Sequence, residues 1–202
     1  MKQINLKIGI DLDNTIIDYS NSLKKLLQEE YKIELKNKTI TKSLIKKQII
    51  EIYGDREWTR AQGLLYSKYL DYANPYSGCV DALKKLSLGG SELYIISHKT
   101  KYPFIGGKKN LILLAKKWIE KNLVHENGIN LFEDANILFN KTINEKIESI
   151  ISHDLDIFID DLEVILKLLP SSVNKIWFTS EIMPSKFIKC SNWEEIMGNI
   201  CQ

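Results

Sequence analysis

Short apolar runs alternate with longer amphipathic segments along most of the chain. The short runs are rich in β-branched residues, which is typical of buried strands, and they predict strands at 4–10, 92–97, 136–139, 156–159 and 174–178. Helical spacing of apolar residues predicts helices at 79–86, 110–123, 143–151 and 162–169, with a last helical turn at 193–197. Strands that alternate with helices in this way form a parallel sheet with helices on both faces. We therefore predict an α/β fold with a doubly wound, Rossmann-like parallel sheet.

Between the first strand and the second lie three further amphipathic segments. Their apolar residues recur at helical spacing over 21–31, 39–53 and 56–73. One crossover connection between parallel strands needs only a single helix. We therefore predict a small helical cap at 20–75, inserted after the first strand into a core formed by 1–19 and 76–202.

Two carboxylates, Asp11 and Asp13, come directly after the first strand. Alternate residues of a strand face the same side, so both side chains should point the same way at the strand end. Close carboxylates repel each other unless a cation lies between them, and oxygen ligands of this kind suit Mg²⁺. Ligands of open α/β sheets bind outside the carboxyl ends of the strands. This stretch therefore predicts a metal site.

Four segments, in chain order, resemble the four motifs of the haloacid dehalogenase-like hydrolases: Asp11, Asp13 and Thr15 after the first strand, Ser97 after the second, Lys146, and the pair Asp160 and Asp161 after the fourth. The resemblance extends over residues 4–169. That superfamily consists mostly of Mg²⁺-dependent phosphatases that act through an aspartyl phosphate. The segments 94–100 and 58–63 look like those of a bacterial subgroup of small phosphatase-like proteins associated with surface-polysaccharide gene clusters.

The first motif holds the predicted nucleophile and acid. A carboxylate such as that of Asp11 can attack phosphorus and form an acyl phosphate, and the resemblance implies this role for it. Asp13 is placed to protonate the leaving oxygen and then to deprotonate water. Haloacid dehalogenases themselves need no such acid, so Asp13 favours phosphoryl chemistry. The resemblance also implies that the backbone carbonyl of Asp13 binds Mg²⁺. Thr15 is expected either to contact phosphate or to cap a helix.

The later motifs supply the phosphate and metal contacts. Ser97 can hold phosphate oxygens with its hydroxyl and its backbone amide. Lys146 would neutralise the negative charge of the site, and Lys141 is the alternative. We prefer Lys146 because it precedes Asp160 by the length of one helix and one strand. Asp160 and Asp161 are the remaining predicted Mg²⁺ ligands, with Asp161 as the direct one.

The net charge of +2 is unevenly distributed. Residues 98–121 contain seven lysines and one acid, and residues 20–75 contain eleven basic and seven acidic residues. This pattern indicates either solvated helix faces or a positive rim that attracts an anionic substrate. We predict substrate contacts for His98, Lys99 and Arg60. The alternatives are a solvated basic loop for the first two and a core position for His98.

Together these features predict a cytoplasmic Mg²⁺-dependent phosphatase for a small phosphomonoester, such as a sugar phosphate or a nucleotide. A phosphotransferase or phosphomutase with the same intermediate is the alternative enzyme, and a non-catalytic binding protein is the alternative class. We predict neither nucleic-acid binding nor membrane association. No apolar run reaches the length of a membrane span, and three scattered cysteines fit a reducing compartment.

Overall fold

The computed structural model describes residues 5–33 and 42–201, and in it the chain divides into two compact units. The first unit contains Met1–Ile17, Pro75–Lys99 and Leu123–Gln202, and the second contains Asp18–Asn74 and Thr100–Asn122. The second unit therefore includes residues 100–122 in addition to most of the predicted insertion at 20–75. The short strands β2 (Ile17–Asp18) and β3 (Asn74–Pro75) pair with each other in a separate two-stranded sheet.

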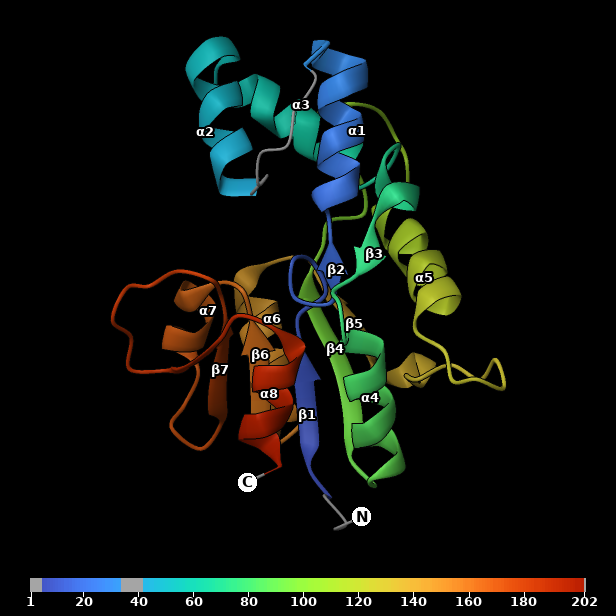
Figure 1. Ribbon diagram of the computed structural model, residues 1–202, viewed down its shortest axis with the longest axis vertical. Helices are drawn as coiled ribbons and strands as arrows, with labels where there is room; N and C mark the ends of the chain where they lie inside the picture. Colours follow the sequence, from blue (N-terminus) through green and yellow to red (C-terminus); the bar gives the residue numbers. More distant parts are fainter. Residues whose placement is uncertain (1–4, 34–41, 202) are drawn as a thin grey trace. The chain divides into compact units, whose positions relative to one another are not determined.

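The first unit is built on a six-stranded parallel sheet (Figure 1). In spatial order its strands are β5 (Ile137–Asn140), β4 (Glu92–His98), β1 (Lys7–Ile10), β6 (Ile157–Asp160), β7 (Asn174–Phe178) and β8 (Ile188–Cys190). The helices α4 (Cys79–Leu88) and α8 (Trp193–Ile200) cover one face, and α6 (Ile143–Ser152) and α7 (Glu163–Leu168) cover the other (Figure 1). The predicted doubly wound α/β fold is confirmed.

Strand β1 marks the point where the direction of winding changes. The chain adds β4 and β5 on one side of β1, and then crosses to add β6, β7 and β8 on the other side. Ligands of open α/β sheets bind at such a switch point, outside the carboxyl ends of the strands. The carboxyl ends of β1 and β6 are therefore the place at which the fold favours a site.

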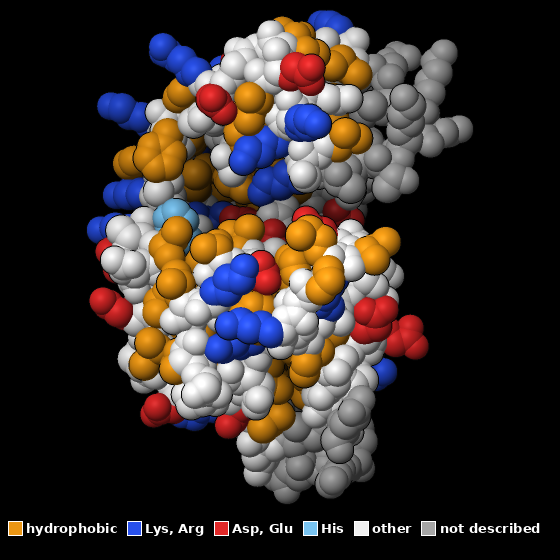
Figure 2. Space-filling model, turned by 90° about the vertical axis from the view of Figure 1, so that its left-hand side faces the viewer, with side chains coloured by type: hydrophobic (Ala, Val, Ile, Leu, Met, Phe, Trp, Pro, Cys, Tyr) orange, Lys and Arg blue, Asp and Glu red, His pale blue; other side chains and the backbone are white. Residues whose placement is uncertain are grey.

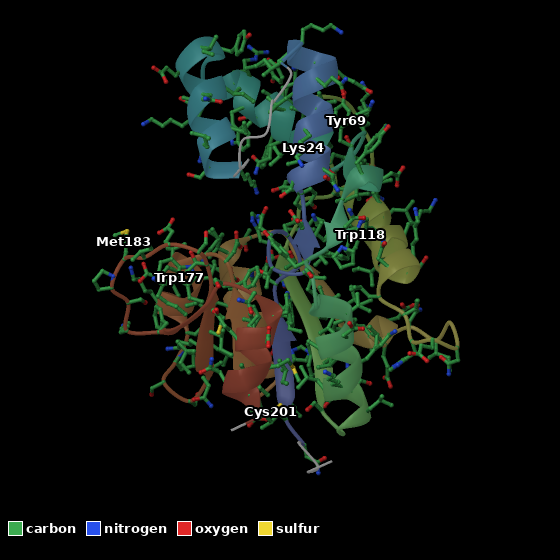
Figure 3. The ribbon with its side chains drawn as sticks, viewed as in Figure 1. Lys24, Tyr69, Trp118, Trp177, Met183 and Cys201 are labelled. Carbon is green, nitrogen blue, oxygen red and sulfur yellow. The ribbon has the colours of Figure 1, made fainter. Side chains whose placement is uncertain are left out.

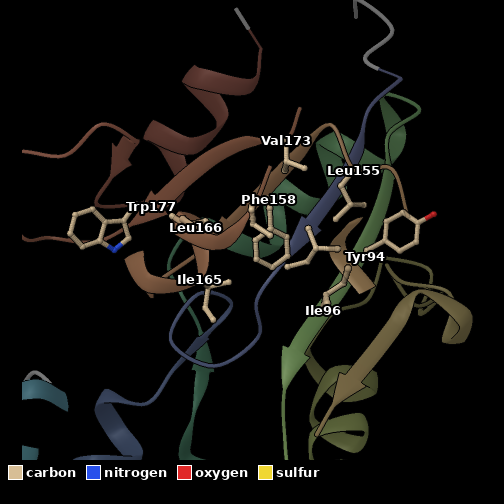
Figure 4. Close-up of a cluster of buried hydrophobic side chains, with 10 residues drawn as sticks. Tyr94, Ile96, Leu155, Phe158, Ile165, Leu166, Val173 and Trp177 are labelled. Carbon is tan, nitrogen blue, oxygen red and sulfur yellow. The ribbon is translucent and has the colours of Figure 1, made fainter. Parts of the chain in front are cut away.

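Close packing beneath this edge depends on a glycine in β1. Gly9 is paired with Phe158 of β6, and a Cβ atom on Gly9 would lie 2.7 Å from Phe158 Cδ2 and 2.4 Å from Leu155 Cδ1. Only glycine leaves room for these side chains at the centre of the sheet. Phe158 belongs to a buried apolar cluster, most of it labelled in Figure 4: Tyr94, Ile96, Ile150, Leu155, Phe158, Ile165, Leu166, Leu169, Val173 and Trp177.

Several predicted boundaries differ from the structure. The start of the first predicted strand at residue 4 and of the predicted helix at 39–41 lie outside the described residues, and the described parts are β1 and α2 (Lys42–Tyr53). The helix predicted at 56–73 was too long. It ends as α3 (Asp55–Leu65), because the carbonyl of Leu64 accepts hydrogen bonds from Ser67 and Tyr69 in place of the regular pattern.

In the C-terminal tail we predicted only a helical turn, and the structure adds strand β8 and a longer helix, α8. The short 3₁₀ helices η1 (Leu70–Tyr72) and η2 (Asp134–Asn136) were also not predicted. Three-residue segments bury too few side chains to leave a periodic pattern in the sequence.

The second unit contains α1 (Ser20–Tyr31), α2, α3, η1 and α5 (Leu111–Asn122). Polar atoms of two buried aromatic residues tie its segments together (both labelled in Figure 3). The indole of Trp118 donates to the carbonyl of Ala73 at 3.1 Å, and the hydroxyl of Tyr69 contacts the carboxylates of Glu29 and Glu30. These bonds link α5 and α1 to the segment that follows α3.

A close contact within the same unit joins α3 to the loop that contains Pro103 and Ile105. A Cβ atom on Gly63 of α3 would lie 2.6 Å from the carbonyl oxygen of Ile105 and 2.9 Å from Pro103 Cβ. The loop that follows Lys99 and Thr100 therefore packs directly on α3, and it does so because residue 63 has no side chain.

The surface of the first unit around α7 mixes apolar and basic side chains (Figure 2). The helix exposes Val164 and Leu168, and the loop after β7 exposes Ile182, which is 98% accessible. Lysine side chains lie between the apolar ones on this face (Figure 2). Within the described residues, no helix is long and apolar enough to cross a membrane.

Candidate active site

Asp11 is held directly beside the end of β6. Its backbone N–H donates to the carbonyl of Ile159 at 2.9 Å, which extends the pairing of β1 with β6 one residue past the strand. Asp160 is the last residue of β6. The two carboxylates therefore emerge from neighbouring parallel strands at the same edge of the sheet.

A tight turn follows and fixes Asp13 and Thr15. The backbone N–H groups of Ile16 and Ile17 both donate to the carbonyl of Leu12, and Asn14 adopts φ +64°. Asparagine tolerates this left-handed conformation better than most residues. The turn is braced from the other end of the chain, because the indole of Trp193 donates to the carbonyl of Thr15 at 3.1 Å.

The side chain of Thr15 is fully buried, and its hydroxyl has no hydrogen-bond partner among the described residues. Its predicted alternative role as a helix cap is wrong, because α1 begins at Ser20 and the residue before it is Tyr19. The carboxylate of Asp18 instead accepts from the N–H of Ser20 at 2.8 Å.

Helix α6 delivers Lys146 to the two carboxylates. Its N-cap is Thr142, whose hydroxyl accepts from the N–H of Glu145, while the Glu145 carboxylate accepts from the N–H of Lys141. This reciprocal arrangement resembles a capping box and fixes the first turn of the helix. The ammonium of Lys146 then lies 2.6 Å from Asp11 Oδ1 and 2.7 Å from Asp160 Oδ2.

The two candidate lysines differ sharply in environment. Lys146 is 2% exposed and bonded to two of the motif acids, whereas Lys141 is exposed. The observed contacts of Lys141 are made by its backbone, whose carbonyl lies 2.9 Å from His98 Nε2. The geometry therefore favours Lys146 over Lys141 as the lysine of the site.

Burial and neighbouring charges have opposing effects on the pKa values of Asp160 and Lys146. Burial raises the pKa of Asp160 to about 6; Lys146 opposes the rise and Asp11 adds to it. Burial alone would lower the pKa of Lys146, but the carboxylates of Asp11 and Asp160 raise it above its ordinary value. Lys146 is therefore a permanent cation between two acids.

The acids also form a group suited to a metal ion. Oxygen atoms of Asp11, Asp160 and Asp161 lie within 4.8 Å of one another. Counted together, these three acids and Lys146, which pairs with Asp11 and Asp160, carry a formal charge of −2, which a divalent cation would neutralise. Carboxylate oxygens are the ligands that Mg²⁺ prefers. The donor set and the charge therefore both fit Mg²⁺, with Asp11, Asp160 and Asp161 as the residues that would hold it.

Hydrogen bonds fix the two acids of the last motif in different ways. One carboxylate oxygen of Asp160 accepts from the N–H of Leu162 at 2.8 Å, so this side chain is clamped by its own turn. The carbonyl of Asp161 accepts from the indole of Trp177 at 3.0 Å, which anchors the backbone of the half-buried Asp161.

The carboxylate of Asp13 is not part of the three-acid group. Its Oδ2 atom lies 2.7 Å from the ammonium of Lys99, in an ion pair whose side chains are 4% (lysine) and 14% (aspartate) exposed. The alternative that Lys99 belongs to a solvated loop is therefore wrong. The predicted contact between Mg²⁺ and the backbone carbonyl of Asp13 stays a prediction.

Strand β4 places Ser97 and His98 at the same edge of the sheet. Ser97 is buried, at 1% exposure, and His98 ends the strand as an exposed side chain. The alternative of a core position for His98 is therefore wrong. Arg60 lies in the other unit, on α3, where its guanidinium pairs with Glu57 at 2.8 Å and with Glu30 at 3.3 Å.

Sequence reasoning missed Asn140. This residue ends β5 opposite His98, and its carbonyl accepts from the N–H of Lys99. It is buried, its Oδ1 atom accepts from the hydroxyl of Ser149, and its Nδ2 atom has no partner among the described residues. A signal was available, since Asn140 is a polar residue at the end of an apolar strand, as Asp11, Ser97 and Asp160 are.

No protein-family model and no curated protein matches the sequence. Solved structures with the same fold include hydrolases of the haloacid dehalogenase (HAD) superfamily. A HAD-superfamily hydrolase from Ehrlichia chaffeensis has 20% identity and a TM-score of 0.55, with 100% of this chain and 98% of that one covered. A haloacid dehalogenase-like hydrolase from Streptococcus pneumoniae has 15% identity and a TM-score of 0.60, with 96% and 98% covered.

A further solved structure carries a more specific description. A predicted phosphatase from Clostridium acetobutylicum has 16% identity and a TM-score of 0.57, and the alignment covers 98% of this chain and 99% of that one. At such identities the likeness establishes the fold. The chemistry of this chain has to be argued from its own residues.

Proposed function

We propose that this protein is a Mg²⁺-dependent phosphatase that hydrolyses a small phosphomonoester through an aspartyl phosphate on Asp11. The observation that carries the proposal is the bridging of Asp11 and Asp160 by the buried Lys146, with Asp161 within 4.8 Å. A structural role does not explain this arrangement, because burial of two acids and a lysine beside a third, half-buried acid costs more in desolvation than burial of an apolar group would.

Each residue has a proposed part in the reaction. The carboxylate of Asp11 attacks phosphorus, and the bond from phosphorus to the leaving oxygen breaks as Asp13 protonates that oxygen. Asp13 then removes a proton from water, which attacks the phosphoryl group and releases Asp11. Lys146 holds Asp11 in place and offsets the negative charge. Bound Mg²⁺ would neutralise phosphate oxygens and the acids around them.

The groups proposed to bind phosphate are Ser97, Thr15 and Asn140. The unpartnered hydroxyl of Thr15 and the unpartnered Nδ2 atom of Asn140 support this proposal, because buried polar groups are normally hydrogen-bonded. A phosphoryl group supplies several acceptor oxygens at once. His98, at the end of the same strand as Ser97, is a proposed contact to the remainder of the substrate.

We propose the second unit as the cap that selects the substrate. The chain leaves the first unit after Ile17 and again after Lys99, a few residues beyond Thr15 and Ser97 respectively. Both connections thus begin close in the chain to proposed site residues, which supports a role for the second unit in controlling them. A sugar phosphate or a nucleotide remains the proposed substrate class, Arg60 a proposed cap contact, and the cytoplasm the proposed location.

The test is a phosphatase screen of the full-length protein with Mg²⁺ over sugar phosphates, nucleotides and an activated aryl phosphate. We expect release of inorganic phosphate from the aryl phosphate and from at least one biological ester, and no release by the Asp11→Asn variant. A correctly folded wild-type protein that releases phosphate from none of these esters would overturn the proposal.

A further inference from the structure

Lys99 stands apart from the exposed lysines that follow it in the chain. Among the described residues, it and Lys146 are the two lysines with buried side chains. Its ammonium lies 2.7 Å from Asp13 Oδ2, which is the length of a charge-assisted hydrogen bond. A lysine that simply made a loop soluble would keep its ammonium in water, whereas this one is 4% exposed.

The backbone of both partners is fixed, so the ion pair has a defined geometry. The N–H of Lys99 donates to the carbonyl of Asn140 at 2.8 Å, which extends the pairing of β4 with β5 beyond His98. Asp13 lies in the braced turn after β1, where it forms a bridge with Ile17. Neither residue depends on a long loop for its position.

Asp13 needs such a counter-charge because of its surroundings. It lies two residues from Asp11, which belongs to the three-acid group with Asp160 and Asp161. Like charges this close repel one another, and an unrestrained carboxylate would turn toward water. The ammonium of Lys99, 2.7 Å from Asp13 Oδ2, supplies a counter-charge that restrains this carboxylate.

We propose that Lys99 is a positioning residue for Asp13, in place of the direct substrate contact that the sequence predicted. The ammonium of Lys99 holds the Asp13 carboxylate where it exchanges a proton with the leaving oxygen and later with water. This role rests on the proposed phosphatase function, and it makes turnover of esters with poor leaving groups depend on a residue that does not touch them.

The test compares an alkyl phosphate with an activated aryl phosphate in the Lys99→Met variant, which keeps most of the length of the side chain and removes its charge. We expect kcat for the alkyl phosphate to fall by roughly 10²-fold, KM to change by less than about threefold, and the first step with the aryl phosphate to be nearly unaffected. Lys99→Arg should recover part of the lost kcat. The matched control, Lys141→Met, removes an exposed lysine at the same edge and should behave as wild type.

Two results would overturn the proposal. A rise in KM with unchanged kcat would mean that Lys99 binds the substrate directly. Unchanged kinetics would mean that the ion pair has no role in the reaction. If Lys99→Met does not fold, Lys99→Gln provides the same comparison with a shorter polar side chain.

A second readout separates this inference from the proposed function. Melting temperatures of wild type, Asp13→Asn, Lys99→Met and the double variant form a double-mutant cycle, and this measurement does not require catalytic activity. We expect the melting temperature of the double variant to fall by less than the sum of the falls in the two single variants. Additive losses would contradict the ion pair even in an active phosphatase. A coupled cycle in a protein inert toward all esters would confirm the ion pair but refute the phosphatase function, and with it the catalytic role proposed for Lys99.

Discussion

The ammonium of Lys146 donates to Asp160 Oδ2 at 2.7 Å, although Lys146 lies in a helix and Asp160 ends the strand that follows it. Neither side chain is more than 2% exposed. Replacing a buried ion pair with apolar residues of similar volume is often neutral or stabilising. The pair is therefore hard to explain by stability, and easier to explain by a need for positive charge beside Asp11 and Asp160.

Removal of this charge should be costly. In Lys146→Met the carboxylates of Asp11 and Asp160 lose their shared counter-ion, and we expect the free energy of unfolding to fall by about 3–5 kcal/mol in chelator. Addition of Mg²⁺ should restore part of it, because a cation then offsets the same charges. Urea unfolding with and without Mg²⁺ measures both effects.

Lys141→Met is the control for that experiment, since Lys141 is the exposed alternative five residues earlier. Its stability should stay within about 0.5 kcal/mol of wild type. Equal stability of the two variants in chelator would show that Lys146 does not carry the charge balance of the site.

The Asp13→Asn variant should separate the two halves of the reaction. A good leaving group such as nitrophenolate needs no protonation, so formation of the aspartyl phosphate should survive, whereas its hydrolysis still needs a base and should slow by roughly 10²–10⁴-fold. Rapid mixing should then show a burst of phenol release followed by slow turnover. If the variant loses the burst of phenol release as well as turnover, Asp13 does not have the acid–base role.

Acid should weaken the second unit through Glu29 and Glu30. Hydrogen bonds from Lys25, Tyr69 and Lys68 lower the pKa of Glu29 from 4.5 to about 2. The pKa of Glu30 is lowered as well, because bonds from Lys68, Tyr69 and Arg60 outweigh the effect of burial, which alone would raise it.

Groups whose pKa is lower in the folded state stabilise the protein above their unfolded pKa, and this contribution is lost as the pH falls. The melting temperature of wild type should therefore exceed that of a Glu29→Gln, Glu30→Gln double variant at about pH 6, and the gap should shrink toward about pH 3. Glu126→Gln, at an exposed acid of the first unit, is the control. A gap that stays constant over this range would contradict the account.

Gly63→Ala should destabilise the protein by about 1–3 kcal/mol, as overpacking does, because the new methyl group would meet the carbonyl of Ile105. Gly198→Ala is the matched control. Gly198 lies in α8 with no atom within 4 Å of an added Cβ, so alanine should be neutral or stabilise by up to about 1 kcal/mol. Thermal unfolding of the two variants decides the point, and a Gly63→Ala protein as stable as wild type would rule out the close contact.

Much of the first unit was predictable because its strands are short apolar runs that end in polar residues. The strand pattern placed Asp11 at a strand end, the resemblance to the family motifs added Ser97 and Asp160, and parallel strands bring their ends to one edge. The same strand pattern applies to Asn140, which was overlooked because asparagine after a strand also suggests an ordinary turn.

Other features depend on contacts that a linear pattern does not encode. The pairing of Lys99 with Asp13 joins residues 86 positions apart, so the lysine looked like its solvated neighbours Lys101, Lys108 and Lys109. The assignment of residues 100–122 to the second unit likewise follows from contacts, among them the bond from Trp118 to Ala73. Helical spacing at 110–123 predicted the helix correctly, but it does not indicate which part of the chain the helix packs against.

The most direct test of the account is to trap the phosphorylated intermediate. The protein is mixed with an activated aryl phosphate and Mg²⁺, quenched in acid within the first turnover, and digested for mass spectrometry. We predict one phosphoryl group on Asp11, its absence in Asp11→Asn, and its absence when a chelator has removed the metal. Phosphate on another residue, or full turnover by Asp11→Asn or in chelator, would contradict the central claim.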